Sequence, residues 1–274
     1  INFENRVERG IKMYVSVAVM DTGIFRHMDF DTRIAGFADF VGRKKYLYDD
    51  NGHGTHVAGI IAGSGKGSNG KYRGIAPDTF LVSVKVLDKS GNGKIENVVE
   101  AAGWIIENKS AMNIRVVNIS FGTRAKMENG PAIETGEDDY ALIMAVEKMW
   151  DSGIVVVAAA GNNGPGNTSV TAPGISKKII TVGAFDDKNF FSGRGPTREC
   201  IVKPEVVVTG SNIIACNNHQ GRYSSKSGTS MAAPVVSGAV ARLIKNNPDI
   251  TPKEVKIWMK SCCKKINVPS EKQG

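Results

Sequence analysis

Two side chains stand where the sequence predicts the ends of structural elements and have types suited to chemistry. Asp21 directly follows an apolar run and precedes Thr22-Gly23, so its carboxylate is expected at the carboxyl end of a central strand. Ser230 lies in a turn of small residues that leads into an apolar helical pattern. A hydroxyl there meets unpaired backbone N–H groups and the positive end of the helix dipole, where an oxyanion can be stabilised. Each setting also suits a plain turn or capping residue, so neither is decisive alone.

A histidine and an asparagine occupy comparable positions elsewhere. His56 closes a glycine-rich stretch before an apolar helical pattern, and the near-neutral titration of imidazole suits proton transfer. His53 stands three residues earlier, but no acidic residue or cysteine nearby on that segment completes a metal site. Asn162 ends an apolar strand pattern, and its neutral amide can stabilise developing negative charge without competing for the proton. The alternative interpretation of Asn162 is a turn residue beside glycine.

The elements that must position these side chains alternate along the chain. Several of the predicted strands are apolar almost throughout, as expected for strands buried on both faces of a parallel sheet; they span residues 14–20, 80–87, 116–120, 154–160 and 179–183. Apolar residues at three- and four-residue spacing predict helices over residues 96–108, 140–152, 230–247 and 251–262. The pattern predicts a single-domain α/β fold with a doubly wound, mostly parallel central sheet and helices on both faces.

Length and composition agree with one large domain. The chain has 274 residues, of which 41% are hydrophobic and 23% charged, so it can bury a sizeable core. No apolar run reaches 18 residues, and charges interrupt the first twenty residues, so we expect no membrane partner and no signal peptide in this chain. The net charge of +8 is dispersed, which argues against nucleic acid as a partner.

The cysteines show no metal-binding spacing. We expect most of them to be free thiols, with a disulfide between Cys200 and Cys216 as the alternative that would favour an oxidising compartment; the other two are Cys262 and Cys263. The localisation of the protein is therefore left unknown.

Four segments, in order, resemble the signature segments of the subtilisin-like serine peptidases. They are DTG at 21–23, HGTHVAG at 53–59, AAGN at 159–162 and GTSMAAP at 228–234. The resemblance covers about residues 10–262, and the wider pattern is similar to the AprX-like or intracellular-type bacterial members. It implies a peptidase domain over residues 1–266, followed by a flexible tail at 267–274.

The resemblance implies a serine endopeptidase that works through an acyl-enzyme, with roles that follow the family's triad. Ser230 would attack the peptide carbonyl, His56 would take its proton and return it to the leaving amine, and Asp21 would orient His56. Asn162 and the Ser230 backbone N–H would hold the oxyanion. The polypeptide substrate would bind extended along residues Ser120, Phe121, Gly122, Gly91, Gly93, Ala159, Ala160, Gly161 and Thr171.

Thr171 stands where relatives often have glycine at the floor of the primary pocket. A β-branched side chain there predicts a short pocket that accepts Leu or Met before the scissile bond and disfavours the largest aromatic residues. The pocket positions include no acidic residue, so Arg and Lys are also expected to be disfavoured.

The resemblance implies no cofactor for catalysis and a propeptide outside this sequence as a further partner. Many relatives bind calcium tightly near residues 63–74, but here this stretch has no Asp or Glu and carries Lys66, Lys71 and Arg73. A structural calcium site is therefore not supported in this stretch, and we assign no metal ligand.

Two other functions could use the same residues. A transpeptidase or macrocyclase would let an amine replace water on the acyl-enzyme. A catalytically silent peptide-binding scaffold is the alternative outside enzymes, and the four intact chemical positions disfavour it.

Overall fold

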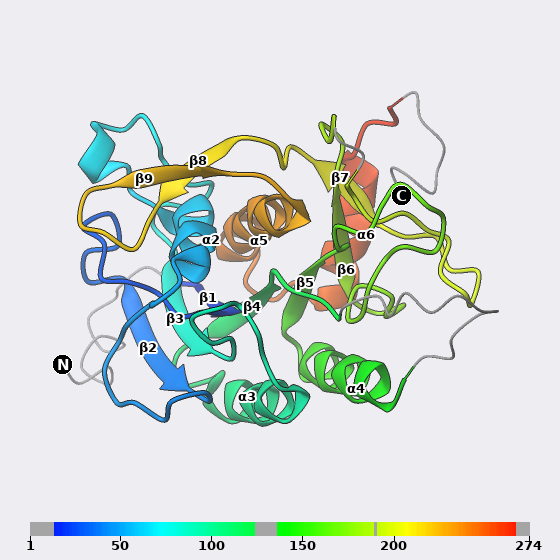
Figure 1. Ribbon diagram of the computed structural model, residues 1–274, viewed down its shortest axis with the longest axis horizontal. Helices are drawn as coiled ribbons and strands as arrows, with labels where there is room; N and C mark the ends of the chain where they lie inside the picture. The colour runs from blue at the N-terminus through cyan, green and yellow to red at the C-terminus, as the bar shows by residue number, and fades with distance from the viewer. Residues whose placement is uncertain (1–13, 124–135, 189–190, 267–274) are drawn as a thin grey trace.

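The computed structural model describes residues 14–123, 136–188 and 191–266 (Figure 1). Seven parallel strands form the central sheet, in the order β2-β3-β1-β4-β5-β6-β7. The strands are β1 (Ser16–Asp21), β2 (Ile34–Asp39), β3 (Phe80–Lys85), β4 (Ile114–Ile119), β5 (Val155–Ala159), β6 (Ile180–Ala184) and β7 (Val206–Val208).

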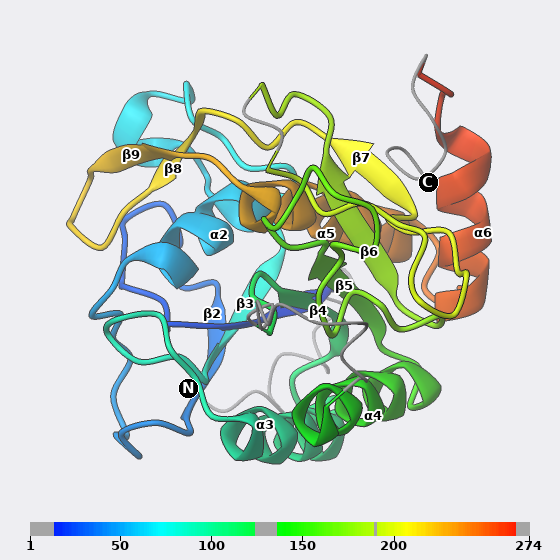
Figure 2. The same ribbon diagram turned by 45° about the vertical axis from the view of Figure 1, so that its right-hand side comes forward.

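Helices cover both faces of this sheet, which confirms the doubly wound fold. In Figure 1, α2 (His53–Ala62) and α5 (Thr229–Asn246) lie above the sheet, while α3 (Ile95–Asn108) and α4 (Glu137–Asp151) lie below it. Figure 2 shows α6 (Pro252–Cys262) beside β6 and β7, and its Val255 and Met259 join the core on the α2 and α5 face.

Successive residues of the central strands feed two separate cores. In β1, Val17 and Val19 belong to the core under α2 and α5, whereas Ala18 and Met20 belong to the core under α3 and α4. Because both faces are buried, β1 is apolar at consecutive positions, as parallel strands generally are.

Part of the architecture was not predicted. The five predicted strands and four predicted helices are present, with ends shifted by a few residues, but β2, β7 and an antiparallel hairpin of β8 (Ile213–Cys216) and β9 (Tyr223–Lys226) were missed. The hairpin lies over α2 (Figure 1). Three of the six residues of β2 are Ala or Gly, and most of the strand is only half-buried at the sheet edge, so it carries little strand signal.

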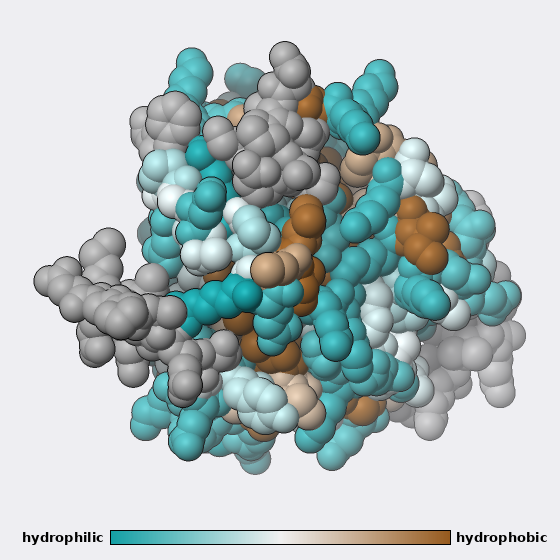
Figure 3. Space-filling model, turned by 90° about the vertical axis from the view of Figure 1, so that its right-hand side faces the viewer, coloured by the Kyte–Doolittle hydropathy of each residue, from teal (hydrophilic) through white to brown (hydrophobic). Residues whose placement is uncertain are grey.

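The remaining expectations concern the chain ends, the cysteines and the surface. The tail at 267–274 and residues 1–13 of the proposed domain lie outside the described residues. All four cysteines lie within the described part of the chain and are free thiols, so the alternative of a Cys200–Cys216 disulfide is wrong. Within the described ranges, no helix is both long and apolar enough to span a membrane. On the face shown in Figure 3, hydrophilic side chains surround small groups of hydrophobic ones.

Candidate active site

The side chains at the carboxyl edge of the sheet converge near β1. This strand lies between β3 and β4, where the order of strands along the sheet reverses, and such a switch point is the usual place for a site in an open α/β sheet. Asp21 is the last residue of β1, and Ser120 directly follows β4. The position of Asp21 at a strand end is as predicted.

The histidine that meets Asp21 is His53. Its Nδ1 lies 2.8 Å from Asp21 Oδ1 and 3.0 Å from Oδ2, and the Thr22 backbone N–H donates to Oδ1 at 2.8 Å. The Asp21 side chain is fully buried, whereas the His53 side chain is 25% exposed. Burial by itself would lower the pKa of His53, but the charge of Asp21 and its hydrogen bond outweigh burial and raise that pKa above its usual value.

The expectation that Asp21 orients His56 as the general base is therefore wrong. His56 lies inside α2 and is fully buried, and its Nε2 donates to the carbonyl oxygens of Ile213 at 3.1 Å and Ser224 at 2.9 Å. Its Nδ1 has no hydrogen-bond partner among the described residues. The helix starts at His53 rather than after His56, so the first histidine faces Asp21 and the second fastens the β8–β9 hairpin to α2.

Burial of His56 predicts a dependence of stability on pH. Burial lowers the pKa of His56 from 6.5 to about 4, so the unfolded chain binds a proton more readily between these values. The contribution of buried, neutral His56 to the free energy of unfolding should be fully present above pH 6.5. It should fall by up to about 3 kcal/mol as the pH drops toward 4. Urea unfolding at a series of pH values measures this change in the free energy of unfolding, in a Ser230→Ala background that prevents self-digestion. His56→Gln should lose this component of the slope, and parallel slopes in the two proteins would contradict the prediction.

Asp49 fixes the start of α2 against the end of β1. Its Oδ1 accepts the Thr22 hydroxyl at 2.9 Å, and the Thr22 hydroxyl oxygen accepts the Gly54 backbone N–H at 2.9 Å. The Asp49 carboxylate also accepts backbone N–H groups in or just before the first turn of α2, at 2.8 to 3.0 Å, from Asn51, Gly52 and Thr55. A Cβ on Gly54 would lie 2.1 Å from the Gly23 carbonyl oxygen, so only glycine permits this close approach. Asp49 was not singled out from the sequence as a helix cap, although aspartate before a helix is such a signal.

Ser230 and Asn162 line one pocket of about 410 Å³. The Ser230 hydroxyl donates to the Ser120 carbonyl oxygen at 2.7 Å. Asn162 Oδ1 accepts both the backbone N–H and the hydroxyl of Thr229, each at 3.0 Å. These two bonds fix the orientation of the side-chain amide, and its Nδ2 lies on the side away from Thr229. Other predicted substrate residues that line this pocket are Phe121, Gly122, Ala159, Gly161 and Thr171.

Thr171 fills the space between two glycine walls of this pocket. A Cβ on Gly122 would lie 2.3 Å from Thr171 Oγ1, and a Cβ on Gly161 would lie 2.6 Å from it. Thr171 is 9% exposed, and its Oγ1 has no hydrogen-bond partner within the described part of the chain. Gly93 lies apart from this pocket and borders a separate hollow with Lys94 and Ile95.

One known protein family matches nearly the whole of this chain. The profile described as "Subtilase family" matches residues 13–274. This chain belongs to the subtilase family.

Characterised subtilases resemble the chain over most of its length. It is 42% identical to serine protease AprX of Bacillus subtilis (strain 168), over 90% of this chain and 60% of AprX, and 35% identical to subtilisin DY of Bacillus licheniformis, over 88% of this chain and 81% of that protein. A cold-adapted subtilisin-like serine proteinase of known structure superposes with a TM-score of 0.76 at 30% identity, covering 94% of this chain and 85% of that one. The chain thus spans about three fifths of the length of AprX.

This subtilase also contains a buried group of metal-ligating types outside the pocket. Ligand atoms of His27, Asp29 and Cys216 lie within 4.8 Å of one another. Hydrogen bonds already engage them: the Asp29 carboxylate accepts the Tyr223 hydroxyl at 2.9 Å, His27 Nε2 lies 3.1 Å from the Arg222 carbonyl oxygen, and Cys216 Sγ lies 3.5 Å from Asp29 Oδ2. Burial raises the pKa of the Cys216 thiol, which keeps it protonated. We interpret the group as a structural hydrogen-bond centre.

The same aspartate reaches the stretch in which calcium was considered. Asp29 Oδ2 accepts the Gly65 backbone N–H at 3.1 Å, and Asp29 Oδ1 accepts the Gly67 backbone N–H at 2.8 Å. Asp29 lies outside residues 63–74 in the sequence, and the fold brings its carboxylate to this stretch from the β1–β2 connection. Both carboxylate oxygens of Asp29 thus accept backbone N–H groups of this loop.

Proposed function

We propose that this subtilase is a serine endopeptidase that forms an acyl-enzyme on Ser230. His53 serves as general base and acid, Asp21 orients His53, and Asn162 stabilises the oxyanion. The observation that carries the proposal is the convergence at one sheet edge of the Asp21–His53 pair with a pocket lined by Ser230 and Asn162. Family membership supports peptide bonds in polypeptides as the substrate.

The hydrogen bonds indicate how protons move. Asp21 accepts Nδ1–H of His53, so Nε2 is the nitrogen that can accept the serine proton. The Ser230 hydroxyl has one proton, which it now donates to Ser120, so it must leave that bond when it transfers the proton to His53. The new bond joins Oγ to the substrate carbonyl carbon, and His53 gives the proton to the amine as the C–N bond breaks. Water, deprotonated by His53, then attacks the acyl-enzyme, and the proton returns to Ser230 Oγ.

The oxyanion position follows from the orientation of Asn162. Thr229 occupies its carbonyl oxygen, which leaves the Nδ2–H groups as donors toward the pocket. The backbone N–H of Ser230 is the second proposed donor, near the start of α5. Donors held in place before the reaction need no reorganisation as charge develops. The four residues catalyse this reaction without a cofactor.

The test is covalent labelling combined with product analysis. A serine-directed fluorophosphonate should label Ser230, and labelling should abolish cleavage of an unstructured protein such as casein. Each peptide product should contain one added water per cleavage. An unlabelled, folded protein would contradict the proposal, as would ligation products from a peptide carrying a free amine.

The substrate is proposed to bind extended, with its side chain before the scissile bond between the two glycine walls. Ala159 lines the same pocket, and Ser120 and Ala160 adjoin the lining residues Phe121 and Gly161 in the chain, where we propose that they offer backbone to the substrate. Gly91 and Gly93 are proposed to offer backbone for residues farther along the substrate. Since none of these residues is charged, the pocket favours an apolar side chain such as Leu or Met.

Replacing Thr171 by glycine should widen this preference. Removing the side chain between Gly122 and Gly161 opens space for an aromatic ring. The ratio of kcat/KM for Phe to kcat/KM for Leu before the scissile bond should rise about 10- to 100-fold, the scale on which apolar pockets discriminate size. Paired peptides that differ only at this residue measure the ratio. Thr171→Val keeps the shape and removes the hydroxyl, so it should leave the ratio near the wild-type value; an unchanged ratio in Thr171→Gly would remove Thr171 from the pocket.

A further inference from the structure

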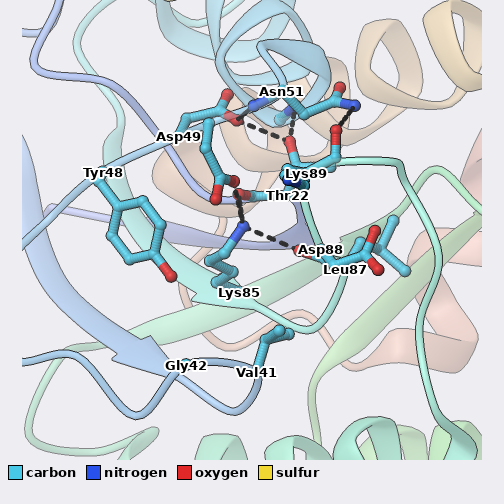
Figure 4. Close-up of polar contacts among 12 residues, drawn as sticks. Thr22, Val41, Gly42, Tyr48, Asp49, Asn51, Lys85, Leu87, Asp88 and Lys89 are labelled. Atoms are coloured by element: carbon cyan, nitrogen blue, oxygen red, sulfur yellow. Dashed lines mark hydrogen bonds and ion pairs between the residues drawn. The ribbon is translucent and has the colours of Figure 1, made fainter.

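A fully buried lysine lies directly beside Asp21. Lys85 is the last residue of β3, is paired in register with Asp21, and is 1% exposed. Its ammonium donates to the carbonyl oxygens of Thr22 at 2.6 Å and Leu87 at 2.9 Å and to Asp50 Oδ1 at 2.7 Å. Figure 4 shows this ammonium where the segments carrying Thr22, Asp49 and Leu87 meet. All three N–H donors of the lysine are therefore engaged.

The three partners belong to segments that the proposed reaction needs. Thr22 follows Asp21, Asp50 lies in the loop before His53, and Leu87 begins the 87–93 loop proposed to bind substrate backbone. The proposed function thus requires these three segments to keep a fixed mutual position, and Lys85 is bonded to each of them.

A second contact joins the same loop to the histidine. Asn51 Oδ1 accepts the His53 backbone N–H at 3.0 Å, and Asn51 Nδ2 donates to the Lys89 carbonyl oxygen at 2.9 Å (Figure 4). The substrate loop is therefore connected to Asp21 through Lys85 and to His53 through Asn51.

A buried charge is an expensive way to fill space. Taking an ammonium out of water carries a large desolvation cost, and an apolar side chain of similar volume often packs as well or better. What an apolar side chain cannot do is donate hydrogen bonds at once to two backbone carbonyl oxygens and to a carboxylate on a third segment. The arrangement therefore favours a role in geometry over a role in packing alone.

We propose that Lys85 is a positioning residue that sets the Asp21–His53 geometry and couples it to the 87–93 loop. This inference rests on the proposed function. Lys85 touches no reacting atom and takes part in no bond change. Loss of its contacts would free the end of β1 at Thr22, and displacement of a catalytic group by about 1 Å can lower the rate about 100-fold.

The charges around His53 predict how substitutions of Lys85 and Asp50 shift the acid limb of the rate–pH profile. Asp21, Asp49 and Lys226 act on His53 by charge, and Lys85 and Asp50 form an ion pair of about zero net charge next to them. Removing only the lysine leaves the Asp50 carboxylate, which favours protonated His53 and moves the acid limb to higher pH. Removing only the Asp50 charge leaves the lysine and moves the limb to lower pH.

The experiment compares Lys85→Met with a matched control, Lys203→Met. Lys203 is also fully buried, and its ammonium bonds Glu205 at 2.8 Å and Thr181 Oγ1 at 3.0 Å, on β6 and the segment before β7. None of these three residues lines the pocket. Fluorophosphonate titration counts competent sites, so kcat refers to folded protein only. For Lys85→Met we expect kcat to fall about 10- to 100-fold with KM within about threefold. Lys203→Met should lower Tm and leave kcat per titrated site within about twofold.

Asp50→Asn keeps the inference testable if Lys85→Met does not fold. Asn retains an oxygen for the Lys85 ammonium, so this variant should fold, and its acid limb should move opposite to that of Lys85→Met. Wild-type kcat per titrated site in Lys85→Met, an equal loss in Lys203→Met, or a change in KM alone would overturn the inference. An acid limb that stays in place in Asp50→Asn would overturn it as well. If the wild-type protein is not labelled at Ser230, the proposed function itself fails, which is a distinguishable outcome.

Discussion

Replacing His53 by alanine is expected to lower kcat by about six orders of magnitude. This figure is the loss known for the relative subtilisin when its triad histidine is removed. The physical reason is that His53, and not His56, bonds Asp21, at 2.8 Å, so its loss removes both the acceptor for the serine proton and the donor to the leaving amine. Initial rates on a chromogenic peptide, with KM determined alongside, measure the effect.

His56→Gln is the matched comparison, because it removes the other histidine of the same helix. The glutamine amide can still donate to the Ile213 or Ser224 carbonyl oxygen, so the variant should fold with a lower Tm. Its kcat per titrated site should stay within about tenfold of wild type, since His56 bonds the hairpin and not Asp21. A folded His56→Gln protein that loses as much activity per site as His53→Ala would restore His56 as the base.

The sequence alone did not show which of the two histidines, His53 or His56, faces Asp21. Both belong to one short motif, and imidazole chemistry is the same at either position. What separates them is the start of α2, which Asp49 fixes by accepting amides of the first turn and the hydroxyl of Thr22, a residue 27 positions away. Gly52 is the N-cap of α2, and glycine is among the residues accepted at that position, so it was a weak signal that the helix starts at His53.

The central strands were predictable because their burial on both faces leaves a continuous apolar signal. The edge strand β2 is half-buried over most of its length, β8 is an apolar run of only four residues, and β9 is mostly polar, so none of them carries that signal. Contacts that join distant segments also escaped: Asp29 to the loop at Gly65, and Lys85 to Asp50. A buried lysine in an apolar run is visible in the sequence, but its partners depend on how the strands are ordered.

Replacing Ser230 by alanine is expected to abolish peptidase activity to a similar extent while leaving the fold intact. Without the hydroxyl no acyl-enzyme can form, and alanine fits at the start of α5, where the Ser230 side chain has one hydrogen bond among the described residues, to Ser120. The decrease should again be about six orders of magnitude in kcat, the value known for the catalytic serine of subtilisin. Circular dichroism and Tm should match the wild-type protein within a few degrees, and activity above a few per cent in a preparation freed of host proteases would contradict the assignment.

The double variant of Ser230 and His53 separates a cooperating triad from independent contributors. Because His53 acts only on the proton of the Ser230 hydroxyl and on the group that the acyl-enzyme releases, its removal should cost almost nothing once the hydroxyl is gone. The residual rate should then depend on the oxyanion donors, so Asn162→Ala added to Ser230→Ala should lower it further, by up to the roughly 100- to 1,000-fold known for subtilisin's own oxyanion asparagine. Losses that simply multiply between Ser230→Ala and His53→Ala would mean that the two residues do not act on the same proton.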